Sequence, residues 1–175
     1  GYLLDMAPKE LEKVLYFAAS MITWVDEEAR AADLEELEGK VNEALDELAA
    51  EKNLRLQEID ESLERREEYL RTGSQAGFSD EDHLWAEHLD INVAKLEDDE
   101  RNKHIKDMRK ALEADRADTE AYIEDAMERL RQAWELFKEM TPKQVVNDET
   151  LFRELKERFG SPYGFGEYFR GGMGA

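Results

Sequence analysis

The residue types that most often carry out chemistry are present in this chain, but their spacing is not that of a metal site. His83 and His88 lie five residues apart, which puts them on different sides of a helix, whereas a zinc-binding pair on one helix needs a spacing of four. His104 is distant in sequence, and the chain has no cysteine for a thiolate site or a disulfide. We therefore expect no metal-binding residues here.

Catalytic motifs are absent as well. Asp and Glu number 44 among 175 residues, so a pair of carboxylates says little about acid–base catalysis. The sequence contains no phosphate-binding loop, dinucleotide fingerprint or nucleophile elbow. The glycines of 171–174 lack the preceding strand and following helix that a phosphate cradle requires. We expect no catalytic and no cofactor-binding residues in the chain.

The acidic charge is concentrated in the middle of the chain. Of the net charge of −20, residues 1–25 carry −1 and residues 141–175 are neutral, which leaves −19 on residues 26–140. Such a field repels phosphate, so we expect no nucleic-acid contact through this part. It suits a solvated arm or a docking surface for a basic protein. No apolar run approaches a membrane span and no signal peptide is present, so we expect no membrane contact. The lack of cysteine is compatible with a reducing cytoplasm, and we predict a cytoplasmic protein.

The elements that would position these residues are mainly helices. Pro8 is placed for the first turn of a short helix over 8–16, and the aromatic and β-branched run of 16–25 predicts a strand that could pair with Val145 and Val146. Two apolar stripes with steps of three and four residues predict long helices over about 33–71 and 103–140. The second stripe is predicted to continue from Leu112 through Asp115, Thr119 and Tyr122 to Ala126.

Two arms of equal length predict a long antiparallel helical hairpin, or coiled coil. The connection over 72–102 begins with a glycine-rich breaker, followed by a short helix capped near Ser79, and should form a small helical tip. The fold class is therefore mainly α, with the hairpin on a small α/β base that has a short two-stranded element. We predict two domains, a discontinuous base of 1–32 and 141–175 and a coiled-coil insert of 33–140.

Large apolar side chains near the ends and at the tip are candidates for an interface. They can equally well close the core, which is the commoner role of such residues, or be surfaces that the rest of a larger protein covers. The candidate interface residues are Leu3, Leu4, Met6, Tyr16, Phe17, Phe78, Trp85, Tyr168 and Phe169.

Two flanking segments resemble a known family. Leu3-Leu4-Asp5-Met6 followed by Glu12-Lys13-Val14-Leu15-Tyr16-Phe17 resembles the clamp of the β′ (largest) subunit of bacterial DNA-directed RNA polymerase. Arg158-Phe159-Gly160, Glu167-Tyr168-Phe169 and Met173-Gly174-Ala175 resemble a stretch further along the same subunit, interrupted by an extra loop at 161–166. The resemblance covers about the first 25 and the last 30 residues.

The resemblance implies that the chain is a piece of a longer protein, a nucleotidyltransferase that synthesises RNA on a DNA template. It implies a clamp segment with a lineage-specific helical insert, and partners among the other polymerase subunits and transcription factors, with DNA reached through the clamp rather than the acidic insert. The family's magnesium-binding and zinc-binding motifs are absent from this chain, so these metals would be held by residues outside it. The resemblance does not say what the insert does. The concentration of acidic charge in it leads us to the hypothesis that it binds a protein partner or modulates the clamp.

Two other functions remain open at this point. A free-standing acidic coiled-coil scaffold or adaptor would explain the arms but not the two flanking motifs. A metal-dependent hydrolase built on a helical bundle would need inward-facing acids and histidines at helical spacing on several helices, and the sequence does not show them.

Overall fold

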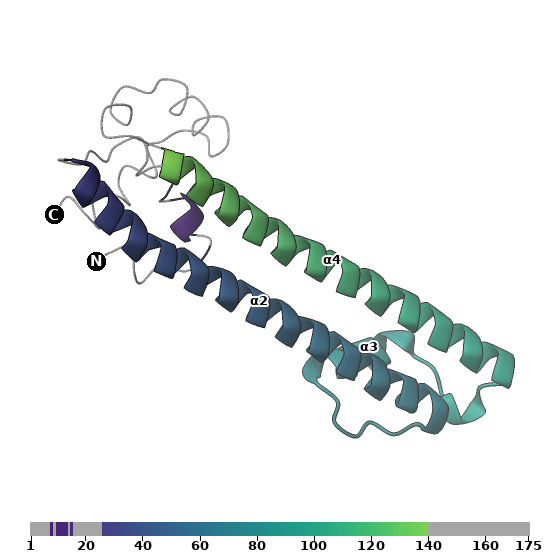
Figure 1. The fold of residues 1–175 in the computed structure, drawn as a ribbon. Coiled ribbons are helices and arrows are strands. Elements are labelled where there is room, and N and C mark those ends of the chain that lie inside the picture. The colour runs from purple at the N-terminus through teal and green to yellow at the C-terminus, as the bar shows by residue number, and fades with distance from the viewer. Residues whose placement is uncertain (1–7, 9, 14, 16–25, 140–175) are drawn as a thin grey trace. The chain divides into compact units, whose positions relative to one another are not determined.

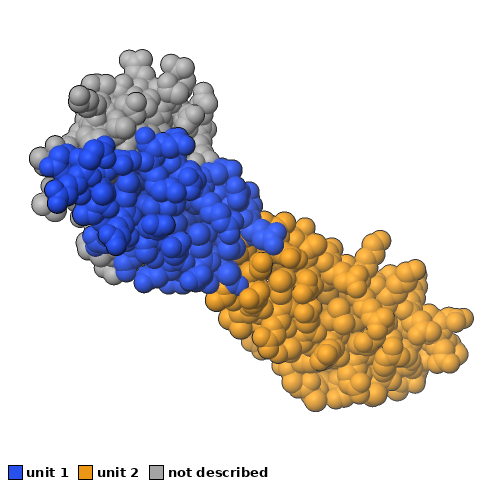
Figure 2. All heavy atoms as spheres, viewed as in Figure 1, with its two compact units in different colours: residues 1–49, 124–175 blue, residues 50–123 orange. Residues whose placement is uncertain are grey.

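The computed structural model describes residues 8, 10–13, 15 and 26–139, and these are mainly helical. The elements over 26–139 are α2 (Glu27–Thr72), α3 (Asp80–Leu89), the 3₁₀ helix η2 (Val93–Lys95) and α4 (Asp98–Glu139). Figure 1 labels the three α-helices among them. Residues 8, 10–13 and 15 are also helical, in agreement with the predicted helix over 8–16. The chain divides into two compact units, residues 1–49 with 124–175 and residues 50–123 (Figure 2).

Helix α2 begins earlier than predicted because Asp26 caps it. The Asp26 side chain accepts a hydrogen bond from the backbone N–H of Ala29 at 2.9 Å, and Glu27 and Glu28 place negative charge in the first turn. Both features stabilise a helix N-terminus. The apolar stripe that begins at Leu34 indicated only where the buried face starts, so the prediction of a start near Asp33 was late.

In the first unit, α2 and α4 bury the apolar stripes that the sequence predicted. Apart from the adjacent Ala133 and Trp134, the buried positions along each helix follow one another at three or four residues, and Leu11 and Leu15 of the first helical segment are also buried. Arg30 of α2 donates a hydrogen bond to the backbone oxygen of Lys138 near the end of α4, so the start of α2 lies beside the end of α4. The buried residues of the two helices in this unit are Leu37, Val41, Ala44, Leu48, Ala126, Leu130, Ala133, Trp134 and Phe137.

In the second unit, ion pairs show that α2 and α4 are antiparallel. Arg116 of α4 contacts Asp60 of α2 at 3.1 Å, and Arg109 contacts Glu67. A lower residue number on α4 thus pairs with a higher one on α2, as in antiparallel helices. Helix α3 packs beside the C-terminal part of α2 (Figure 1). The buried core here contains Tyr69, Leu70, Val93, Ile105, Met108 and Leu112.

The stripe on α4 differs from the prediction at its centre. Tyr122 is 52% exposed and Asp115 is exposed, whereas Ile123 is buried at 1% exposure. Leu112 and Ile123 are eleven residues apart, which is three turns of an ordinary helix, so both lie on the same buried face. The prediction used heptad steps instead, and these led to Tyr122.

The remaining fold predictions concern residues outside the described part. The strand of 16–25, its pairing with Val145 and Val146, and the helix that reaches Phe159 all lie there, and so does the predicted α/β base. Residues 26–139 contain no strand. The division into a base and an insert at 33–140 stays a prediction.

Candidate functional site

The first turn of α3 is fixed by a capping box, as the sequence predicted. The Ser79 side chain accepts a hydrogen bond from the Asp82 N–H at 3.1 Å, and the Asp82 carboxylate accepts one from the Ser79 N–H at 3.1 Å. The two residues therefore satisfy backbone N–H groups that a helix start leaves without partners. The same carboxylate turns toward α2, where it meets three more donors.

Asp82 is fully buried, and its two oxygens are surrounded by donors of α2. The Ser62 hydroxyl donates to Oδ1 at 2.5 Å, Arg66 Nε donates to Oδ1 at 2.8 Å, and Arg65 Nε donates to Oδ2 at 2.7 Å. Burial by itself would raise the pKa of Asp82, but the hydrogen bonds from Ser62, the two arginines and the Ser79 N–H outweigh it and hold this pKa well below its usual range. The carboxylate is thus ionised and cannot serve as a proton donor near neutral pH.

A groove of about 820 Å³ lies beside this cluster, between α2, the start of α3 and α4. Its lining is strongly charged and of both signs, with Arg55, Arg65 and Arg66 opposed by acids such as Glu58 and Asp80. Known small-molecule sites are mostly apolar with a few convergent polar groups, and this groove lacks that character. We assign it no ligand. Its chemistry is that of an ion-pair network that joins α3 to α2.

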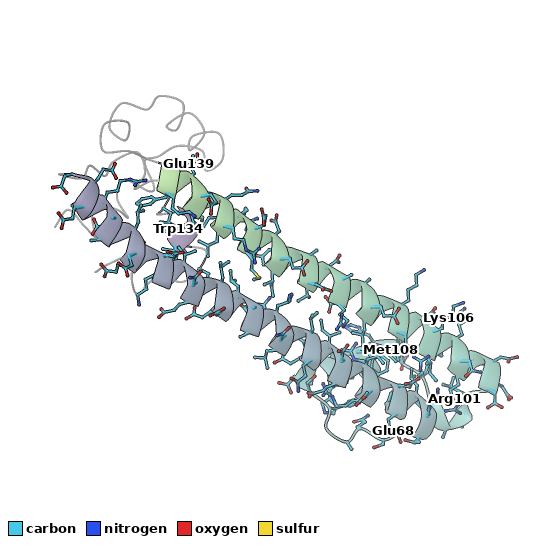
Figure 3. The ribbon with its side chains drawn as sticks, in the orientation of Figure 1. Glu68, Arg101, Lys106, Met108, Trp134 and Glu139 are labelled. Carbon is cyan, nitrogen blue, oxygen red and sulfur yellow. The ribbon has the colours of Figure 1, made fainter. Side chains whose placement is uncertain are left out.

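An aromatic cluster adjoins the Asp82 contacts, because Arg66 belongs to both. Tyr69 lies 5.5 Å from Phe78 and 5.7 Å from Trp85 between ring centroids, and the Arg66 guanidinium lies 5.0 Å from the Trp85 ring. Edge contacts of aromatic rings and a cation over an indole both add to the stability of such a cluster. Figure 3 shows the end of α2, where Arg101 of α4 reaches back and donates to the Leu70 oxygen at 2.6 Å.

The structure describes only two of the predicted interface residues. Phe78 and Trp85 are half-buried and pack against the core of the second unit, while Leu84 of α3 is 56% exposed. Their role as a partner contact stays a prediction. The other candidates, Leu3, Leu4, Met6, Tyr16, Phe17, Tyr168 and Phe169, lie outside the described residues.

The three histidines and the acids show no metal geometry in the described part of the chain. His83 packs edge-on against Phe78 at 5.2 Å, His88 is exposed and His104 is half-buried. Within residues 8–139 as far as they are described, no group of three or more His, Cys, Asp or Glu side chains could hold a metal ion. No described helix is both long and apolar enough to cross a membrane.

Sequence reasoning found the cap at Ser79 but not the contacts of Asp82 with Ser62, Arg65 and Arg66. The only local signal is that a serine and two arginines stand at the spacing of one helical turn on α2, and charged residues at that spacing are common throughout this chain. The pairing depends on the path of the loop between the helices, which brings α3 back against α2.

Comparison with known proteins gives a consistent result. The chain is 39% identical over 175 residues to the β′ subunit of DNA-directed RNA polymerase of Rubrobacter xylanophilus, 37% identical over 175 residues to that of Acidothermus cellulolyticus, and 39% identical over 175 residues to that of Streptomyces coelicolor. Each match covers 100% of this chain but only 13%, 11% and 11% of the relative. No protein-family model and no solved structure matches.

These alignments run through the helical middle as well as the flanks, so the similarity is wider than the two flanking motifs indicated. All three relatives are β′ subunits of DNA-directed RNA polymerase, and the chain spans between about a ninth and an eighth of their length. The resemblance inferred from the flanking residues is confirmed: the chain belongs with the β′ subunits of DNA-directed RNA polymerase, of which it matches one segment.

Proposed function

We propose that this chain is a structural segment of the β′ subunit of DNA-directed RNA polymerase and takes part in DNA-templated transcription in the cytoplasm. The observation that carries the proposal is the similarity to β′ subunits at 36–39% identity over the whole chain. A free-standing acidic scaffold would require a similar helical hairpin but would not account for β′-like sequence at both flanks and between them.

We further propose that the segment belongs to the clamp, with residues 33–140 projecting as an insert. The support is the pair of flanking motifs and the adjacency of the two hairpin ends, since Arg30 bonds to the Lys138 oxygen. A long insertion whose ends lie side by side can be accommodated with little change in the host structure. The relatives contain sequence similar to the insert, as expected if they share it.

The segment is proposed to be non-catalytic on its own, with the chemistry of the polymerase carried by other parts of the subunit. In the described part of the chain, the one carboxylate with a strongly lowered pKa, Asp82, is occupied by three side-chain donors of α2 and by the Ser79 N–H at the start of α3. A carboxylate held in this way stabilises structure and leaves no free oxygen to bind a metal or accept a proton.

The insert is proposed to serve as an arm that binds another polymerase subunit or a transcription factor, or that influences clamp position. Its charge of −19 over residues 26–140 supports a basic partner surface, because complementary charge steers association and suppresses wrong partners. Leu84 is an exposed apolar side chain on α3 among the acids Asp80, Glu81 and Glu87, and so would offer such a partner an apolar contact.

The test is a polymerase in which residues 33–140 of this segment are replaced by a short Gly–Ser linker, which the adjacency of Arg30 and Lys138 makes feasible. We expect RNA synthesis on a preassembled DNA–RNA scaffold to be retained, while promoter binding or capture of a transcription factor changes. A matched control replaces only the exposed loop residues 74–76 by a Gly–Ser linker of equal length, which leaves Phe78 and the Ser79 cap in place. Unchanged promoter binding, elongation and factor capture would refute the arm, and loss of scaffold-directed synthesis would refute a non-catalytic role.

A further inference from the structure

One stretch of α4 departs from the acidic character of the insert. Residues 101–110 contain Arg101, Lys103, Lys106, Arg109 and Lys110 and a single acid, Asp107. This is a local excess of four positive charges inside a region with a net charge of −19. The net charge of the whole insert does not show this basic segment. Whether its charges are available to a partner depends on which of the five basic side chains contact other residues of the fold.

Two of the five basic groups are committed to the fold. Arg101 donates to the backbone oxygens of Leu70 and Leu96 at 2.6 and 3.1 Å. Arg109 pairs with Glu67 of α2. Both face the rest of the second unit, and neither is available to a ligand without breaking these contacts.

The other three basic groups form one exposed face, which we call the lysine face. Lys103, Lys106 and Lys110 are spaced by three and four residues, so they lie on one side of α4 over about 10 Å of helix axis. All three are exposed, whereas the core positions of the same helix stretch, Ile105 and Met108, are buried. Lys106 extends from the side of α4 that faces away from α2 (Figure 3).

The lysine face is not neutralised by the acids around it. Within the described residues, Lys40 and Lys138 pair with acids three residues away on their own helices, but Lys103, Lys106 and Lys110 form no ion pair with any described side chain. Four exposed acids of α4 neighbour these lysines in sequence: Asp99 and Glu100 before Lys103, Asp107 between Lys103 and Lys110, and Glu113 after Lys110. None of the four is paired with a lysine of the face. The face therefore presents three unpaired ammonium groups to solvent, with one carboxylate between them and others at its two ends.

We propose that the lysine face binds the phosphate backbone of duplex DNA without reading its sequence. Three ammonium groups act as point charges toward phosphates, and the face has neither the arginine forks nor the aromatic rings that read or stack on bases. The remote acids of the insert weigh little, since charges beyond about 8 Å are largely screened at physiological salt. The choice of DNA over another polyanion rests on the proposed function, which places the chain in a DNA-bound enzyme.

This proposal departs from the expectation that the acidic insert makes no contact with nucleic acid. That expectation followed from the mean charge of residues 26–140. Binding through phosphate depends instead on the number of basic groups that can approach the backbone together. The structure supplies three of them on one helix face.

The experiment measures binding of the 175-residue chain to a short fluorescein-labelled DNA duplex by fluorescence anisotropy. One variant carries Lys103→Gln, Lys106→Gln and Lys110→Gln. The matched control carries Lys40→Gln, Lys52→Gln and Arg131→Gln, which lowers the net charge by the same three units at scattered positions on α2 and α4. A glutamate-rich peptide with the same label tests whether an acidic protein is the better partner.

We expect the unmodified chain and the scattered control to bind DNA with an affinity that falls about 40-fold between 50 and 200 mM salt, as three phosphate contacts predict. The lysine-face variant should lose this binding and its salt dependence. Equal losses in both variants, tighter binding of the glutamate-rich peptide than of DNA, or no DNA binding by the unmodified chain at 50 mM salt would each overturn the proposal. None of these outcomes depends on assembly with polymerase subunits, so they are distinct from failure of the proposed function.

Discussion

The Asp82 carboxylate offers a direct test of what holds α3 to α2. Replacing it by asparagine keeps its shape but removes the charge that Arg65 and Arg66 share. The side chains of these arginines are only 24% and 13% exposed, so solvent can replace the lost contacts only in part. Removing one partner of a buried ion pair costs about 3–5 kcal/mol, and the partial exposure of the arginines places this case near 3 kcal/mol.

Because the chain has two compact units, a global unfolding curve would mix two transitions, and a local measurement is needed. Amide hydrogen exchange over α3, followed by mass spectrometry, reports the opening of this helix alone. A change of 3 kcal/mol corresponds to roughly 150-fold faster exchange in the Asp82→Asn variant. Asp80→Asn is the matched control, since Asp80 is exposed in the same turn and should contribute less than about 1 kcal/mol through the helix dipole.

The pH dependence of this difference has a definite sign. The pKa of Asp82 in the folded chain lies below its ordinary value of 3.8, so its contribution is fully present above about pH 5 and declines as the pH falls through the unfolded value. The gap in exchange between the unmodified chain and Asp82→Asn should be largest near neutral pH and should narrow below about pH 4. A gap under about 5-fold at neutral pH, or one that does not change with pH, would refute the reasoning.

Three further predictions test other parts of the structure. Ile123→Ala should destabilise α4 locally by about 2–4 kcal/mol and so speed amide exchange around residue 123 by roughly 30-fold or more, because Ile123 is 1% exposed. Tyr122→Ala should cost less than about 1 kcal/mol, or about 5-fold in exchange; the opposite order would mean that the heptad register holds. Arg101→Ala should speed amide exchange in the last turn of α2 by about 10-fold or more, since its guanidinium satisfies carbonyls there, and unchanged exchange would show that water replaces it fully. Gly77→Ala should speed amide exchange over α3, because Gly77 has φ +75° and an added Cβ would meet the Arg65 side chain at 3.2 Å; unchanged exchange would show that the loop yields without cost.

Local features were predictable because they depend on neighbours in sequence. Apolar residues three or four apart identified the two long helices, and a serine followed at three residues by an acid identified the start of α3. The C-terminal end of α2 also depends on a local feature. Gly73 has φ +80°, and its N–H donates to the Tyr69 oxygen at 2.8 Å. Asp26 is also a residue type that favours the N-cap of a helix, but the predicted start of α2 was based on the apolar stripe and therefore fell at a later residue.

The sequence by itself determined that this chain forms long acidic helices and that it resembles a β′ segment at both flanks, since helix period, capping and family motifs are properties of consecutive residues. Only the tertiary structure decided the rest. Whether Tyr122 or Ile123 is buried depends on the rotation of α4 against its neighbours, and whether Asp82 is a surface acid or a buried ion pair depends on the loop that returns α3 to α2. Likewise, only the structure shows that Arg101 and Arg109 contact α2 while the lysines of 101–110 remain exposed. The reason is that an ion pair or hydrogen bond depends on distance in space rather than in sequence.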